Sequence, residues 1–123
     1  MSIDFEKLQL SARNSSMKLL QQGSGTLNVP SGTTTPGGDN NTEATTTIAH
    51  NYGSDQLLVQ VSIGSFLGEE PGWVIPYVNP PGTIWIFPHL NSTNLYITGA
   101  EARPSGVTAG GYSVQYYYRI FIP

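Results

Sequence analysis

The sequence predicts an all-β protein: a single β-sandwich or jelly-roll-like domain with an extended N-terminal arm. From residue 44 onward, short segments rich in β-branched and aromatic residues follow one another, separated by Gly, Pro or Asn. About eight such segments at roughly 8–12-residue spacing are typical of a sandwich or a jelly roll. No alternation of strand and helix patterns is present, and the length of 123 residues is that of one domain.

The beginning of the chain predicts an arm, residues 1–16, ahead of a domain at 17–123. The apolar residues of the arm follow a two-residue repeat about as well as a helical one, so an extended or short helical arm is expected. A partner protein could bind these side chains, which makes the arm the expected attachment segment. They are Ile3, Phe5, Leu8 and Leu10.

The next stretch predicts two short strands, at 17–21 and 26–29, with glycine breaks around the second in "GSGTLNVPSG". Residues 31–44, "SGTTTPGGDNNTEA", combine low hydrophobicity with many turn-forming residues and predict a long loop. A strand with one apolar face is expected in "LLVQVSIG", where alternate positions are apolar. These positions are Leu57, Val59, Val61 and Ile63.

Three short strands are expected next, in "WVIPYV", "TIWIF" and "TNLYITG". Pro76 within the first favours an edge strand or a bulge, because proline cannot donate to a strand ladder. The final segment, "YSVQYYYRIFI", predicts the longest strand. Both of its faces are largely apolar or aromatic, so we expect it to be central or covered on two sides.

Composition points to a protein that works through neutral surfaces. Charged residues make up only 11% of the chain, against about 25% in typical globular domains. The surface is therefore expected to be neutral and polar, or covered by partners. The net charge is −3 and the five basic residues do not cluster, so nucleic-acid binding through phosphate contacts is not expected.

Several classes of site and location are disfavoured by the sequence. The absence of cysteine excludes disulfides, thiolate zinc sites and cysteine nucleophiles. The first residues, "MSIDFEKLQL", carry acids before any apolar run and do not look like a signal peptide. No apolar run approaches the ~20 residues that span a bilayer, so membrane insertion is not expected. No glycine-rich loop has nucleotide-binding spacing, and no cofactor is expected.

His50 stands at a corner between two strands, in "TTTIAHNYGSDQLLVQVSI". A catalytic histidine would need a nucleophile and an orienting acid within hydrogen-bond reach. However, "HNYGSD" is an ordinary turn composition, in which Asn51 and Gly53 tolerate positive φ. We therefore expect His50, Asn51 and Gly53 to be structural turn residues.

The second histidine, His89, also stands where a strand is expected to end. Together with His50 and nearby acids it could form a metal site, but no histidine pair has ligand spacing, and no metal is expected. One alternative stays open: in a symmetric trimer, either histidine could meet an ion on the axis.

Glu69 and Glu70 are adjacent in "GEEPGW". Glycoside hydrolysis needs two carboxylates that converge on the substrate. Adjacent residues of an extended chain point in opposite directions, so a solvated acidic loop is expected. We assign no catalytic residue and do not expect an enzyme.

Aromatic residues give the strongest sign of a binding surface. Four of them are expected to share one face of two successive strands, with aliphatic residues on the other face, and two more on the last strand could extend that face. Such a face suits a subunit interface, then a second buried layer, then a platform on which sugars stack. The first four are Trp73, Tyr77, Trp85 and Phe87, and the two on the last strand are Tyr117 and Phe121.

The chain resembles small bacteriophage virion proteins, which are short β-rich proteins or tail-fibre tip domains. The resemblance rests on "GTLNVPSGTTT", on "TTTIAHNYG" with the alternating strand after it, and on the closing "YYYRIFI", and it covers residues 17–123. Such chains often continue Gly-Tyr-x-Pro after the corner, whereas here Gly53 is followed by Ser54, Asp55 and Gln56. The corner is therefore expected to differ in shape.

The resemblance implies a non-enzymatic structural protein of the virion, located in the particle as a capsid decoration, fibre or tail component. It also implies self-association, as a homotrimer or another homo-oligomer, and contacts with other virion proteins. The alternative is a carbohydrate-binding module that recognises a host surface glycan, with Trp73 or Trp85 exposed to the sugar.

Overall fold

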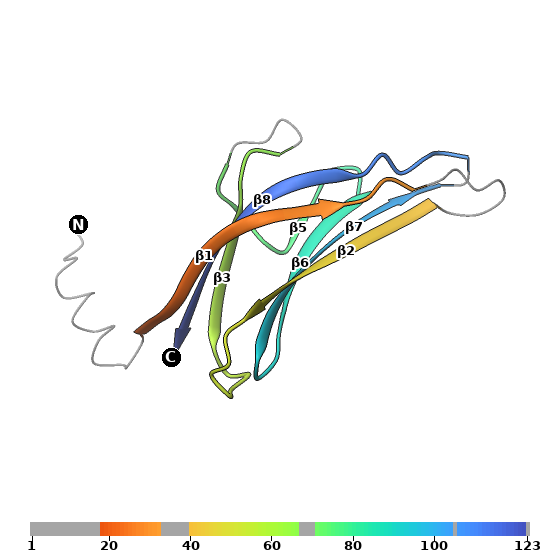
Figure 1. Cartoon of the computed structure of the whole chain (residues 1–123). Coiled ribbons are helices and arrows are strands. Elements are labelled where there is room, and N and C mark those ends of the chain that lie inside the picture. Colours follow the sequence, from red (N-terminus) through yellow and green to blue (C-terminus); the bar gives the residue numbers. More distant parts are fainter. Residues whose placement is uncertain (1–17, 33–39, 67–70, 105, 123) are drawn as a thin grey trace, which may run out of the picture.

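The predicted β-sandwich is confirmed by the structure, a computed structural model that describes residues 18–32, 40–66, 71–104 and 106–122. Two antiparallel four-stranded sheets pack face to face (Figure 1). Sheet A has the order β1 (Lys18–Val29), β8 (Tyr112–Ile122), β3 (Leu58–Ile63), β4 (Trp73–Val74). Sheet B has the order β2 (Asn40–Ala49), β7 (Asn94–Arg103), β6 (Ile84–Leu90), β5 (Tyr77–Val78). The described residues contain no helix, and hence none that is long and apolar enough to cross a membrane.

The first strand pairs with the last, so the two ends of the described chain lie side by side. The second strand pairs with the seventh in the other sheet. This half of the sandwich has the rolled-up pairing of a jelly roll. In the other half, strands pair with their neighbours in sequence: β3 with β4, β5 with β6, and β6 with β7. The long strands β1 and β2 each form one edge of their sheet. The opposite edges are formed by β4 and β5, which are only two residues long.

The core lies between the sheets and is built from alternate residues of nearly every strand. The expected apolar face of β3 is confirmed, with Val61 and Ile63 fully buried. The last strand is central in sheet A, as expected, and its inward residues include the buried Val114, Tyr116 and Ile120. Its opposite face is open to solvent, so the strand is covered on one side only.

The first two predicted strands form one continuous strand, because β1 runs through the expected glycine break. Gly23 lies opposite Tyr118, and Gly25 lies opposite Tyr116. The tyrosine rings fill the space that side chains at these glycines would occupy: a Cβ at Gly23 would lie 2.7 Å from the Tyr118 hydroxyl. The prediction of a break was wrong because a cross-strand aromatic ring compensates for each missing side chain.

Part of the predicted 31–44 loop belongs to a strand, because β2 begins at Asn40. Asn40 to Ala44 pair with the end of β7, from Arg103 back to Gly99. Their polar composition disguised the strand, since alternate residues such as Asn41 and Glu43 point to solvent. Residues 33–39 of that loop and the arm at 1–16 lie outside the described residues.

The sequence predicts a single strand in "WVIPYV", and this prediction is wrong. The segment forms two strands of two residues each, which belong to different sheets. The chain leaves sheet A after Val74 and enters sheet B at Tyr77, crossing at Ile75–Pro76, whose peptide bond is cis. Because Pro76 has no N–H, it cannot extend either ladder. The predicted edge position is confirmed, since β4 and β5 are both edge strands, and the proline also marks the crossing between the two sheets.

A tyrosine joins the two sheets near one end of the core. The Tyr112 hydroxyl, from sheet A, donates to the backbone carbonyls of Ala100 at 3.3 Å and Trp85 at 3.4 Å in sheet B. Gly99 makes room for it, because a Cβ there would lie 2.6 Å from the hydroxyl and 2.7 Å from Leu27. Burial raises the pKa of Tyr112 to about 12, with a smaller contribution from the charge of Glu101.

Glu101 is a buried acid, 3% exposed, at the same end of the sandwich. One carboxylate oxygen accepts from Arg103 Nε and Nη2, both at 2.8 Å, and the other accepts from the Gly111 N–H at 2.9 Å. These partners satisfy both oxygens, which is the condition for a buried carboxylate to be tolerated. The contact also ties the end of β7 to the start of β8.

We predict that Tyr112 makes the fold sensitive to alkali. A pKa raised from 10 to about 12 means that the contribution of the neutral hydroxyl is fully present below pH ~10 and is lost as the pH rises through ~12. The loss should be of order 2 kcal/mol. Urea unfolding at both ends of this range should show that the wild type loses more stability than Tyr112→Phe. Equal losses in the two proteins would contradict the assignment.

Candidate binding surface

The turn that follows β2 holds His50 in place through both ring nitrogens. The ring is 6% exposed, Nδ1 accepts the Tyr52 N–H at 3.1 Å, and Nε2 lies 2.8 Å from the Asn91 carbonyl. Because Nδ1 accepts, Nε2 must carry the proton and donate to that carbonyl. The backbone N–H of His50 donates to the Thr93 carbonyl at 2.8 Å. These contacts bind the turn to the β6–β7 hairpin and leave no ring nitrogen for a substrate.

The rest of the turn reaches across to sheet A. Asn51 and Gly53 have φ values of 55° and 72°, the backbone conformation that their residue types allow. Tyr52 stacks on His50 with ring centroids 5.4 Å apart, and its hydroxyl donates to the Leu20 carbonyl at 3.0 Å. Asp55, the nearest acid along the chain, instead accepts from Gln56 Nε2 at 3.0 Å. The turn therefore connects the two sheets.

His89 is exposed on the outer face of sheet B, where it stacks on Tyr96 with ring centroids 5.9 Å apart. In the part of the chain that the structure describes, no group of three His, Cys, Asp or Glu side chains could hold a metal ion. Glu69 and Glu70 lie outside the described residues. The alternative of an ion on a symmetry axis does not fit His50, because its ring is buried and both of its nitrogens are hydrogen-bonded to backbone groups; of the two histidines, the exposed His89 alone could meet such an ion.

The four aromatics expected on one face do not form one surface. Tyr77 is only 6% exposed and packs in the core against Phe66, at 5.9 Å between ring centroids. Trp73 is 50% exposed at the edge of sheet A, while Trp85 and Phe87 lie on the outer face of sheet B. The prediction failed because the chain crosses between the sheets at Ile75–Pro76.

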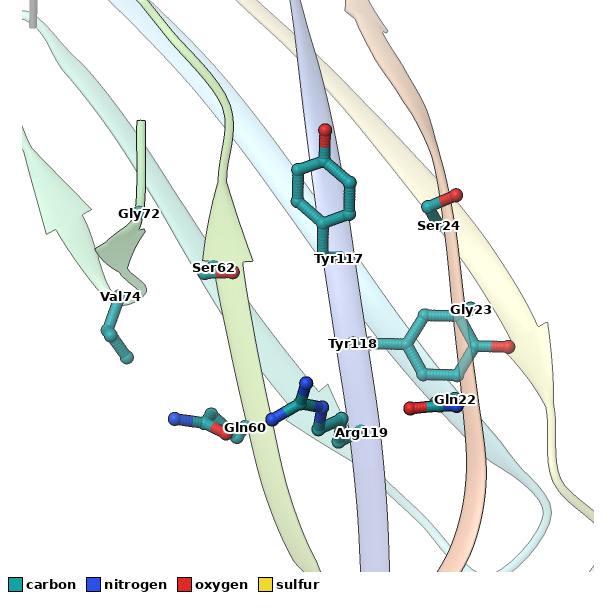
Figure 2. Close-up of a pocket in the computed structure, with 10 residues that line it drawn as sticks. All are labelled: Gln22, Gly23, Ser24, Gln60, Ser62, Gly72, Val74, Tyr117, Tyr118 and Arg119. Carbon is teal, nitrogen blue, oxygen red and sulfur yellow. The ribbon is translucent and has the colours of Figure 1, made fainter. Parts of the chain in front are cut away.

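Sheet A carries a groove of about 500 Å³ on its outer face (Figure 2). Two rows of side chains from β1, β8 and β3 form its floor. In one row Tyr117 lies between Ser24 and Ser62, and in the next row Arg119 lies between Gln22 and Gln60. Gly72 and Val74 border the groove on the β4 side. We call this site the Tyr117 groove.

The next row on the same face is apolar. Leu19 and Leu58 both lie opposite Phe121, and they are 48% and 49% exposed. A bulge in β1 between Leu19 and Gln21 turns Leu19 outward, since without it the two-residue alternation would point Leu19 to the core. We call Leu19, Phe121 and Leu58 the apolar row. Contiguous exposed apolar side chains mark interaction surfaces.

Comparison with known proteins gives no matching family model, no matching curated protein and no matching solved structure.

Sequence reasoning identified part of this surface. The alternation of the last strand predicts that Tyr117, Arg119 and Phe121 share one face, whereas the charge pattern of the sequence shows only that Arg119 does not cluster with other basic residues. The four flanking polar residues were not singled out, because their positions depend on the register of β1 and β3 against β8. They are Gln22, Ser24, Gln60 and Ser62.

We predict that His50 stabilises the fold and that His89 does not. His50→Ala leaves the Asn91 carbonyl and the Tyr52 N–H without their partner, which should lower the free energy of unfolding by about 1–3 kcal/mol. His89→Ala, at an exposed position, is the matched control and should change it by less than about 0.5 kcal/mol. Urea unfolding of the two variants measures both values. A harmless His50→Ala would contradict the structural role.

Proposed function

We propose that the protein is a non-enzymatic structural component of a bacteriophage virion that works through self-association and contacts with other virion proteins. A capsid decoration protein, a fibre and a tail component all fit this description. The observation that carries the proposal is the apolar row, in which the half-exposed Leu19 and Leu58 flank the partly buried Phe121 on three adjacent strands. The low charge of the chain, 11%, and the resemblance of "TTTIAHNYG" and "YYYRIFI" to virion proteins support it.

We infer that the apolar row binds the N-terminal arm of a second copy of the chain. The arm supplies suitable side chains at Ile3, Phe5, Leu8 and Leu10. It precedes Lys18, which pairs with Ile122 at the end of sheet A, so a straight continuation of β1 leads away from its own apolar row. A fully extended arm of 16 residues could reach roughly 50 Å, far enough to contact a neighbouring molecule.

We predict that the full chain self-associates and that the apolar row and the arm carry the association. Leu58→Thr introduces a β-branched residue, which suits a strand, but removes apolar surface worth about 1.5–3 kcal/mol when buried. Its dissociation constant should rise roughly tenfold or more, and Phe5→Ser should have a similar effect. Sedimentation velocity at several concentrations measures both.

Val78→Thr is the matched control, since Val78 is 60% exposed but lies in sheet B, away from the apolar row. It should associate like the wild type. A full chain that stays monomeric at all concentrations would contradict the proposal, as would an equal effect of Val78→Thr.

The virion assignment makes a separate prediction. Particles produced from the genome that encodes the chain should contain it, and deletion of residues 1–16 should abolish its incorporation while the β-sandwich stays folded. Mass spectrometry of purified particles and circular dichroism of the truncated chain measure the two effects. Normal incorporation of the truncated chain would contradict the role of the arm, and absence of the intact chain from particles would contradict the virion assignment.

A further inference from the structure

We propose that the Tyr117 groove binds a saccharide that carries a carboxylate, such as a uronic or sialic acid residue of a surface glycan. This function goes beyond self-association and does not depend on it. It also differs from the sugar platform expected at Trp73 and Trp85, which lie in different sheets.

Tyr117 supplies an accessible aromatic ring in the groove. The side chain is 44% exposed, although it belongs to the central strand of sheet A. Its cross-strand neighbours on this face are Ser24 and Ser62, whose short side chains leave room beside the ring (Figure 2). The apolar C–H face of a sugar ring can stack on such an aromatic surface.

Arg119 supplies a positive charge beside that ring. The described residues that line the groove include no acid, and no carboxylate in the described part of the chain lies within ion-pair distance of Arg119. The planar guanidinium can bind a carboxylate through two parallel hydrogen bonds. Tyr117 and Arg119 are two residues apart, which is about 7 Å along the strand. This spacing suits a monosaccharide acid, because its carboxylate lies beside the sugar ring: the ring can stack on Tyr117 while the carboxylate binds Arg119.

The neighbours of Arg119 suit the sugar hydroxyls. Gln22 and Gln60 lie on either side of it, and each amide can both donate and accept, as sugar hydroxyls do. The groove volume of about 500 Å³ falls within the roughly 300–1,000 Å³ of small-ligand sites. A small inorganic anion would use Arg119 alone and leave the tyrosine ring without a role. A saccharide acid uses both.

The test compares acidic and neutral sugars on the full chain by isothermal titration calorimetry. The matched pairs are sialyllactose with lactose, and an oligogalacturonate with a maltooligosaccharide of equal length. We expect at least one acidic sugar to bind ten times or more tightly than its neutral counterpart. Added NaCl should weaken that binding, because the charges meet at an exposed site.

Three variants locate the site. Tyr117→Ala should weaken binding of the acidic sugar at least tenfold, and Arg119→Gln should reduce it to the level of the neutral sugar. Gln115→Ala is the matched control, since Gln115 lies on the same face of β8 but outside the groove, and it should bind like the wild type. Circular dichroism confirms that each variant is folded, and sedimentation confirms that its association is unchanged.

Absence of binding by both acidic sugars would overturn the proposal. Equal binding of acidic and neutral sugars would overturn the role of Arg119, and wild-type affinity of both groove variants would overturn the location. None of these outcomes bears on self-association, which the apolar-row variants test separately.

Discussion

The pairing of β8 with β1 on one side and with β3 on the other is the constraint on which the rest of the structure depends. Because strand residues alternate between faces, this single register gives the inner face Val114, Tyr116 and Ile120, which build the core. The same register gives the outer face Tyr117, Arg119 and Phe121, each centred between two side chains of the neighbouring strands. A slip by one residue would exchange the two sets and remove the core and the surface together.

The turn at His50 contributes to this arrangement from the opposite sheet. His50 fixes the turn to the β6–β7 hairpin, and Tyr52 extends from the turn to the carbonyl of Leu20. Leu20 is the extra residue of the bulge in β1, and the bulge is what points Leu19 to solvent. The geometry therefore supports a structural role for His50, which helps to position the apolar row. Both of its ring nitrogens are hydrogen-bonded to backbone groups.

The sequence was sufficient for properties that depend on local pattern. Alternation in "LLVQVSIG" predicted the buried face of β3, the length and composition of the last strand predicted its central place in a sheet, and turn residues predicted the corner at Asn51 and Gly53. Properties that depend on contacts distant in sequence were not predictable. The glycines of β1 needed Tyr116 and Tyr118 opposite them, "WVIPYV" divided between two sheets, and the groove required three strands in register.

The central claim is that the apolar row on the outer face of sheet A binds the N-terminal arm of a second copy of the chain. Site-specific photo-cross-linking of the full chain tests it most directly, with benzoylphenylalanine placed at Leu58 on this face or at the exposed Thr47 on the outer face of sheet B. The account predicts intermolecular products from position 58, attached to peptides of residues 1–16, and few or none from position 47. Equal products from both positions, or none from position 58, would contradict it.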